Sequence, residues 1–455
     1  MSAEVTLQTT LDRATAPAIA APQLVYALLE MRLTDDLPAA RLPLALSLVV
    51  DCSRSMRIPI LTPDQFEVLA RRGHAREVMV DGMPVWQFQD VPPELAAQTP
   101  RSLDFVKIAL RNVLERLGPE DRFALVAFAD QAETLIGSES GENKRRLLAA
   151  LERLDRLSLG DDTYMAKGMA LGYQEALRSL APGRVQRMIL LTDGFTRDED
   201  ECRRQARQAA AQGIAISTVG LGVEFNEELL LGIADASRGQ GYFVQDPQEI
   251  PAILAREMER AEKVALREVE LKLRLAAGVE ARRATQVQPV IADLPPAQRM
   301  GREFSVRLGD LEQGPAHAIL LELLAPPRPP GVVRLARVEV AYDRPHDGSR
   351  GQANADIVIA YAAGEQGQGQ REGRVLKWAE AVAARRLQAE AVRALQDGDV
   401  ADAAVKLRSA ATRLLHLGEE ELAQAAAREA ERLEQGGQAS PAATKRLSYA
   451  TRRLE

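Results

Sequence analysis

Between residues 44 and 260 the sequence alternates strand-like and helix-like segments, and this alternation constrains the fold more than any other feature. Strand-like runs lie at 44–51, 122–130, 187–192, 214–220 and 241–244, and helical periodicity lies at 102–117, 143–157, 163–180, 198–212, 226–237 and 247–260. Runs such as MILLT and IAISTVG are almost wholly apolar, which is typical of strands buried on both faces of a parallel sheet. The pattern therefore predicts a doubly wound, Rossmann-like α/β domain over residues 43–260.

The segments that flank this domain have a different periodicity. Residues 4–33 resemble two strands, and from about 261 to 361 apolar residues recur at every second position, as in ALREVELKLRL and REFSVRL. This pattern predicts an antiparallel β-sandwich over 261–362, which the strands of residues 1–42 are expected to join. After a Gly/Gln-rich linker, helical periodicity over 374–455 predicts a C-terminal α-helical bundle.

Composition argues against several classes of function. The formal net charge is -7 with both signs interspersed, whereas a general nucleic-acid binder needs clustered Lys and Arg. No stretch approaches the roughly 20 apolar residues of a membrane span, and the N-terminus lacks the pattern of a signal peptide. The two cysteines and four histidines are scattered, without disulfide or zinc spacing. We therefore expect a cytoplasmic protein that binds neither nucleic acid nor membrane.

Oxygen ligands lie at three places where a strand ends or a helix begins. Asp51 ends the run LALSLVVD, and Ser53 and Ser55 follow at alternating positions. Thr163 begins a predicted helix, and Asp193 ends the strand MILLTD. Because ligands of such folds bind beyond the carboxyl ends of the strands, and hard oxygens select Mg²⁺, Mn²⁺ or Ca²⁺ over zinc, these residues predict a site for one of those ions. With two carboxylates only, the coordination of Mg²⁺ stays incomplete, so a carboxylate of another protein can complete it.

The motifs DCSRS and LTDG, with the loop at Thr163 between them, resemble the von Willebrand factor A domain and its metal-ion-dependent adhesion site. The resemblance covers residues 40–260. It implies that Ser53, Ser55 and Thr163 contact the metal directly, and that Asp51 and Asp193 act mostly through bound water.

The added strands and the helical tail look like bacterial cytoplasmic members of this family, related to calcium-activated chloride channel-like proteins. The partners that this resemblance implies include an AAA+ ATPase and the kinases and phosphopeptide-binding proteins of bacterial signalling assemblies, and the sequence does not choose among them.

Asp161 and Asp162 stand before Thr163, where the family more often carries glycine. We interpret these acids as caps of the helix that is predicted to begin at Thr163, because acidic groups suit helix N-termini. The alternative is that their negative charge weakens the attraction of the site for an acidic ligand. Asp162 is also a candidate outer partner of the metal site, acting on a ligand rather than on the ion. Cys52 alternates away from the ligands, so we expect it to be a small buried residue.

A segment of residues 57–101 separates the DCSRS motif from the next predicted helix. Within it, 62–72 is expected to be helical, and EVMV-DG-MPVWQF is expected to form a hairpin with DG at its turn. The hairpin carries Trp86 and Phe88, which are candidates for contacts with a partner next to the metal. The alternative is that these aromatic residues pack the small module onto the domain.

No catalytic motif stands out in the sequence. It lacks a GxxxxGKS/T phosphate loop, a GxGxxG after the first strand of the α/β domain and a GxSxG elbow. We therefore expect a protein that is not an enzyme: a metal-dependent protein–protein interaction scaffold whose bound Mg²⁺ captures an Asp or Glu of a partner. The alternatives are a metal-independent structural scaffold that acts through its helical tail, and a divalent-metal hydrolase.

Overall fold

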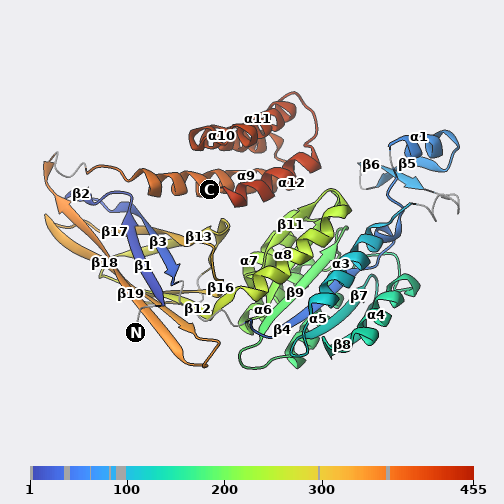
Figure 1. Ribbon diagram of the computed structural model, residues 1–455. Coiled ribbons are helices and arrows are strands. Elements are labelled where there is room, and N and C mark those ends of the chain that lie inside the picture. The colour runs from blue at the N-terminus through green and yellow to red at the C-terminus, as the bar shows by residue number, and fades with distance from the viewer. Residues whose placement is uncertain are drawn as a thin grey trace.

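A six-stranded sheet in the order β11-β10-β9-β4-β7-β8 forms the centre of the α/β domain (Figure 1). The computed structural model describes residues 4–34, 41–61, 63–80, 83–88, 99–295, 298–364 and 369–454. The strands of this sheet are β4 (Leu44–Asp51), β7 (Arg122–Phe128), β8 (Ala132–Ser140), β9 (Val185–Thr192), β10 (Ala215–Leu221) and β11 (Gly241–Val244). Neighbouring strands pair in parallel, except that β8 runs antiparallel to β7. The predicted doubly wound domain is confirmed, and β8 is an addition to it.

Helices cover both faces of this sheet, which is why its central strand is apolar almost throughout. They are α3 (Ser102–Arg116), α4 (Lys144–Arg153), α5 (Met165–Arg178), α6 (Glu199–Ala211), α7 (Glu227–Ser237) and α8 (Ile250–Glu262). All residues of β4 are buried. Leu48 and Val50 pack with residues of α3 and α8, whereas Val49 packs with residues of α5 and α6 on the opposite face.

Two further sheets pack face to face as the predicted β-sandwich. The first has the order β1-β3-β17-β13-β14, and its strands are β1 (Val5–Leu11), β3 (Gln23–Leu33), β17 (His317–Ala325), β13 (Glu280–Gln288) and β14 (Ala292–Asp293). The second has the order β15-β16-β12-β18-β19-β2, and its strands are β15 (Gln298–Met300), β16 (Glu303–Glu312), β12 (Val264–Leu275), β18 (Gly331–Asp343), β19 (Arg350–Ala362) and β2 (Thr15–Pro17). Because β3 pairs with β17, the N-terminal strands lie in the sandwich and the α/β domain is inserted between the two parts of it.

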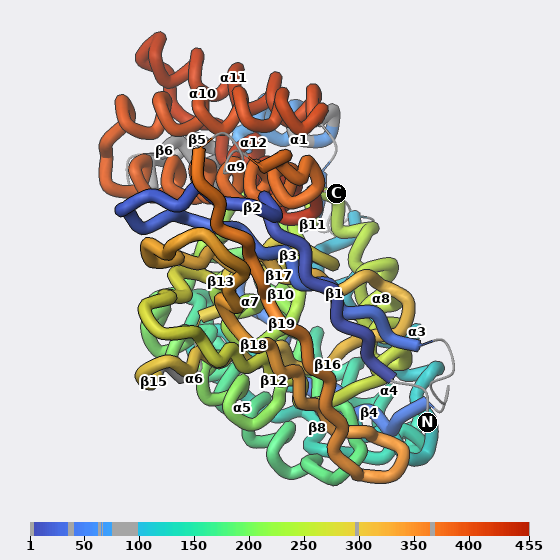
Figure 2. Tube along the Cα trace, turned by 90° about the vertical axis from the view of Figure 1, so that its left-hand side faces the viewer, coloured from blue at the N-terminus to red at the C-terminus, as the bar shows by residue number. Residues whose placement is uncertain are grey.

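The C-terminal region is helical and contacts both other parts of the protein (Figures 1 and 2). Its helices are α9 (Gly373–Gln396), α10 (Val400–Leu417), α11 (Glu420–Glu434) and α12 (Pro441–Ala450). Trp378 of α9 packs in one cluster with Leu28 and Leu320 of the sandwich. Tyr449 of α12 packs instead with Phe225 and other residues of the α/β domain. In the part of the chain that the structure describes, no helix is long and apolar enough to cross a membrane.

The segment between the DCSRS motif and α3 forms a small module that projects from the α/β domain (Figure 1). It contains α1 (Pro63–Arg71) and a hairpin of β5 (Ala75–Val80) and β6 (Met83–Phe88), which are the helix and the hairpin that the sequence predicts. Asp81 and Gly82, the predicted turn, lie outside the described residues.

Candidate metal centre

The five predicted ligand residues come together at the carboxyl edge of the central sheet. Ser53 Oγ lies 3.2 Å from Ser55 Oγ, and the Ser55 hydroxyl donates to Asp193 Oδ1 over 2.6 Å. Thr163 approaches from a separate loop: a Cβ added to Gly194 would lie 3.3 Å from its hydroxyl oxygen. Glycine after Asp193 therefore leaves room for this hydroxyl.

Asp51 is fully buried, and its carboxylate is oriented by two donors. The backbone N–H of Ser53 donates to Oδ1 over 2.8 Å, and the Thr192 hydroxyl donates to Oδ2 over 2.6 Å. Thr192 ends β9, directly before Asp193, and sequence reasoning missed its role because the contact joins residues 141 positions apart. Cys52 is buried as predicted, and burial raises the pKa of its thiol to about 12, so the thiol stays protonated at neutral pH.

The electrostatics of the site favour a bound cation. Burial raises the pKa of Asp51, and burial together with the charge of Asp51 raises the pKa of Asp193 to about 8. No Lys, Arg or His within the described ranges makes an ion pair with either carboxylate. The two carboxylates carry like charges and Asp51 is fully buried, so they repel each other when both are ionised. A bound cation would remove this repulsion. Two carboxylates and three hydroxyls are hard oxygen donors, so this set fits Mg²⁺, Mn²⁺ or Ca²⁺.

The predicted capping of the next helix by Asp161 and Asp162 is wrong. Helix α5 begins at Met165, later than the predicted start at Thr163, and no acidic residue lies in its first turn. The N–H of Met165 donates to Thr196 Oγ1 over 2.9 Å, and the next N–H donates to the Asp198 carboxylate over 3.1 Å. Acceptors from the loop after β9 therefore satisfy this helix terminus and hold the Thr163 loop against the Asp193 loop.

Asp162 lies on the surface beside the site. Its carboxylate pairs with Arg197 over 3.3 Å, with both side chains more than half exposed, and its N–H donates to Asp130 Oδ1 over 2.8 Å. Among the contacts of the described residues, none joins the Asp162 side chain to a ligand residue. Asp130, and not Asp162, holds this loop in place through its carboxylate. Gly160, with φ +100°, packs so closely that an added Cβ would overlap the Asp130 carboxylate.

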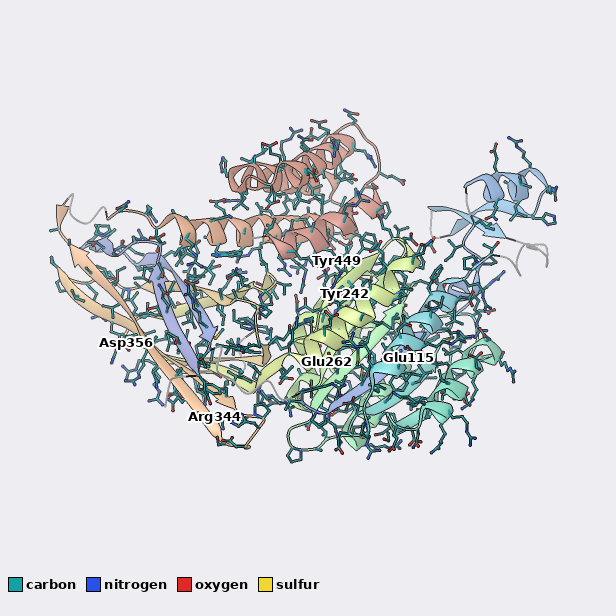
Figure 3. All side chains as sticks on the ribbon, viewed as in Figure 1. Glu115, Tyr242, Glu262, Arg344, Asp356 and Tyr449 are labelled. Atoms are coloured by element: carbon teal, nitrogen blue, oxygen red, sulfur yellow. The ribbon has the colours of Figure 1, made fainter. Side chains whose placement is uncertain are left out.

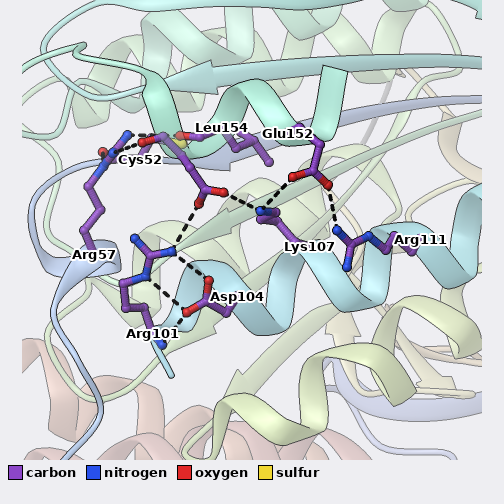
Figure 4. A network of polar contacts seen from close by, with 9 residues as sticks. Cys52, Arg57, Arg101, Asp104, Lys107, Arg111, Glu152 and Leu154 are labelled. Carbon is purple, nitrogen blue, oxygen red and sulfur yellow. Dashed lines mark hydrogen bonds and ion pairs between the residues drawn. The ribbon is translucent and has the colours of Figure 1, made fainter. Parts of the chain in front are cut away.

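Polar contacts hold both ends of the inserted module next to the loop that carries Ser53 and Ser55, called the metal loop below (Figure 4). At the first end, Arg57 donates to the carbonyl of Cys52 over 3.1 Å and to the carbonyl of Asp155 over 3.3 Å. At the second end, Arg101 donates to the Asp155 carboxylate over 3.2 Å, and Lys107 of α3 pairs with the same carboxylate. Both ends of the module thus contact the same residue, Asp155, beside the backbone that carries Ser53 and Ser55.

Trp86 and Phe88, the predicted partner-binding residues, lie in β6, where their backbones pair with Glu77 and Ala75. Their side chains lie outside the described part of the structure. Both assignments therefore stay predictions.

Two protein-family models match the chain. The von Willebrand factor type A domain matches residues 97–256, and the Sll0103-like, C-terminal alpha-helical domain matches residues 373–455. The first match begins near the end of the inserted segment, at residue 97, and leaves out the DCSRS motif. The structure shows that β4, which carries this motif, lies between β7 and β9 in the same sheet, so β4 belongs to the domain.

Relatives and solved structures agree with these matches. The chain is 28% identical over 314 residues to the protein sll0103 of Synechocystis sp., an alignment that covers 68% of this chain and 74% of the relative. It is 26% identical over 163 residues to the protein YfbK of Escherichia coli. This alignment covers 35% of this chain and 28% of that protein.

Among solved structures, a von Willebrand factor type A protein from Catenulispora acidiphila has a TM-score of 0.74 at 16% identity, covering 100% of this chain and 97% of that one. The ArnB paralog VWA2 from Sulfolobus acidocaldarius has a TM-score of 0.58 at 15% identity, covering 99% and 98%. These likenesses show a shared fold across all parts of the chain. The protein therefore contains a von Willebrand factor type A domain, a fold typical of protein-interaction domains, together with a C-terminal helical domain of the Sll0103-like type.

Proposed function

We propose that this protein is a metal-dependent protein–protein interaction scaffold and not an enzyme. Its metal-ion-dependent adhesion site would hold Mg²⁺, or Mn²⁺ or Ca²⁺, and capture an Asp or Glu side chain of a partner protein. One observation carries the proposal: the fully buried Asp51 and the half-buried Asp193 share a site with three hydroxyls, and neither carboxylate has a cationic partner in the described ranges.

The chain's own residues have distinct tasks in this proposal. Ser53, Ser55 and Thr163 offer neutral hydroxyl ligands, so the bound ion keeps a net positive charge that attracts an outside carboxylate. Asp51 and Asp193 hold the ion from the buried side. When bound, the ion supplies a Lewis-acidic charge and an open coordination position for the partner.

We propose that the partner is a protein with an exposed acidic side chain. An AAA+ ATPase or a kinase of a bacterial signalling assembly fits the predicted family, provided that it presents an exposed acidic side chain. We further propose that the inserted module selects the partner, because Arg57 and Arg101 root it beside the metal loop. Deleting residues 62–100 should then abolish partner binding and leave Mg²⁺ affinity unchanged, and unchanged partner binding would refute this role.

The first experiment is an affinity capture from the lysate of the source cells with the full chain, in Mg²⁺ and in EDTA, read by mass spectrometry. Partners that depend on Mg²⁺ should be lost with Thr163→Ala, while Mg²⁺ binding measured by calorimetry persists. The variant Asp51→Ala should lose Mg²⁺ binding itself. The matched control is Thr412→Ala, which removes an exposed hydroxyl on α10, far from the site in sequence and fold.

Two outcomes would contradict the proposal. Unchanged Mg²⁺ affinity in Asp51→Ala would show that the ion does not bind where these five residues meet. Partners that are retained in EDTA and in Thr163→Ala would favour a metal-independent scaffold. The observation that favours this second candidate is the helical tail, which contacts both the sandwich and the von Willebrand factor type A domain.

A further inference from the structure

A groove of about 620 Å³ runs between α8, the edge strand β11 and the C-terminal helix α12. It lies where the von Willebrand factor type A domain meets the helical tail, at Tyr242 and Tyr449 (Figure 3). Neither domain forms this groove alone, because α8 and β11 contribute one part of its lining and α12, with the turn after it, contributes the other.

The walls of the groove carry an excess of positive charge. Arg256 comes from α8, and Arg446 and Arg453 come from α12 and the turn that follows it; Glu249 is the acidic residue that lines the same groove. All three guanidinium groups belong to exposed residues, and none makes an ion pair within the described ranges. Arg446 donates to the neutral Gln245 side chain over 2.7 Å. In a chain with a formal net charge of -7, this is a local concentration of uncompensated cations.

The floor of the groove is aromatic and aliphatic. Tyr242, Phe243, Tyr449 and Ile253 line it, and the ring centroids of Phe243 and Tyr449 lie 5.8 Å apart. The guanidinium carbon of Arg453 lies 5.7 Å from the centre of the Tyr242 ring. Arginine and tyrosine on a rigid apolar floor are the residue types that dominate binding energy at protein interfaces.

We infer that this groove binds an acidic peptide segment of a partner protein, as a second recognition site that needs no metal. The arginine walls complement Asp and Glu side chains, and the aromatic floor accommodates an apolar side chain between them. A peptide fits better than an isolated phosphate, because an apolar floor contributes nothing to binding a small anion. A nucleic acid fits less well, because three arginines in one groove do not form the extended basic surface that a phosphate backbone follows.

The wall that α12 contributes is held rigidly against the domain. The Lys445 ammonium donates to the carbonyl of Phe225 over 2.7 Å, and the Ser448 hydroxyl donates to Glu227 over 2.6 Å. Both contacts are buried, so Arg446 and Arg453 start from a fixed backbone. A site that is formed before binding loses less conformational entropy when its ligand arrives.

The test uses the full chain in EDTA, so that the metal site cannot capture the probe. The probe is a fluorescein-labelled peptide of about 12 residues in which Asp and Glu flank one Phe, the scale of segment that grooves of this kind bind. Fluorescence anisotropy should show saturable binding that weakens as NaCl rises from about 0.05 M to about 0.5 M. The combined variant Arg256→Glu, Arg446→Glu and Arg453→Glu should weaken binding by about tenfold or more.

The matched control reverses the charge of exposed arginines on the sandwich, Arg282→Glu and Arg337→Glu, and should leave peptide affinity within about twofold after correction for net charge. A peptide with Gln and Asn in place of the acids should not bind. Absence of saturable binding at low salt would overturn the inference, as would equal weakening by the sandwich variant. Binding of a single-stranded oligonucleotide in place of the peptide, with the same dependence on the groove arginines, would also overturn it. None of these outcomes depends on the metal site.

Discussion

Replacing Asp193 by asparagine should stabilise the metal-free domain at alkaline pH and remove its response to Mg²⁺. The substitution keeps the shape of the side chain, and the amide oxygen can still accept the hydrogen bond that the Ser55 hydroxyl donates to Asp193 Oδ1. What changes is the charge, because the amide group carries none beside the buried Asp51 carboxylate. Replacing a residue that only supports the fold should destabilise the domain. Replacing a metal ligand that is repelled by a neighbouring carboxylate should instead stabilise the domain when no metal is bound.

The pKa of Asp193 fixes the sign and the pH window of this effect. In the folded, metal-free protein this pKa is raised from 3.8 to about 8. The folded state therefore keeps a proton that the unfolded state loses, so the contribution to stability is fully present below about pH 4 and is lost as pH rises to about 8. At about 1.4 kcal/mol per tenfold change in proton affinity, the upper limit is about 6 kcal/mol. Because Asp193 is half-buried, water screens its charge, and we expect about 1–3 kcal/mol.

Hydrogen exchange of the β9 amides measures this effect locally, which matters in a chain of several packed parts. In EDTA, the wild type should lose protection between about pH 4 and about pH 8 relative to Asp193→Asn, after correction for intrinsic exchange. Saturating Mg²⁺ at the higher pH should stabilise the wild type by about 2.7 kcal/mol at one hundred times Kd, and the variant by nothing measurable. Asp162→Asn, an exposed neighbour, is the control. Equal responses of wild type and Asp193→Asn to Mg²⁺ would refute the reasoning.

Three other substitutions test how the site and the tail are held. Gly160→Ala should shift Asp130 and the loop before α5, because an added Cβ overlaps that carboxylate; calorimetry should show about 1–3 kcal/mol lower stability and weaker Mg²⁺-dependent partner binding. Arg57→Gln should lower Mg²⁺ affinity severalfold in titration calorimetry, whereas an unchanged affinity would show that the carbonyl contact of Arg57 does not position the metal loop. Trp378→Ala should cost about 3–5 kcal/mol in the exchange protection of α9, because its side chain packs between the tail and the sandwich.

The sequence predicts the central sheet well because strands that are buried on both faces appear as runs of consecutive apolar residues. Every residue of β4 is buried, so its segment is apolar almost to the end, and the first charged side chain marks the functional edge. Strand β8 was missed for the opposite reason. It is an edge strand, most of its residues are only partly buried, and its sequence AETLIGSES therefore carries no clear alternation.

In the candidate site, too, the residues that local sequence patterns mark were predicted, and the contacts between residues far apart in the sequence were not. Asp51 and Asp193 end predicted strands, so strand order alone brings them to one edge. The assignment of Asp162 as a helix cap relied on a local rule, and it failed because α5 begins later, at Met165. The side chain that satisfies this helix terminus, Asp198, lies more than thirty residues further along the chain, where no local pattern reports the contact.

The arrangement of the parts was also beyond sequence reasoning, and it has a functional consequence. On α7, the Asp235 carboxylate accepts from Arg452, which follows α12, over 2.8 Å, and pairs with Arg385 of α9 over 3.4 Å. Arg385 in turn lies 3.7 Å from Asp293 of the sandwich. Loss of the Asp235 carboxylate alone would leave the buried Arg452 guanidinium unpaired, at a cost of about 3–5 kcal/mol. Because this junction fixes the tail against the von Willebrand factor type A domain, the proposed metal site and the proposed arginine groove would keep a set separation. A partner that presents two acidic segments at that spacing would gain from both sites at once, whereas each segment alone would bind weakly.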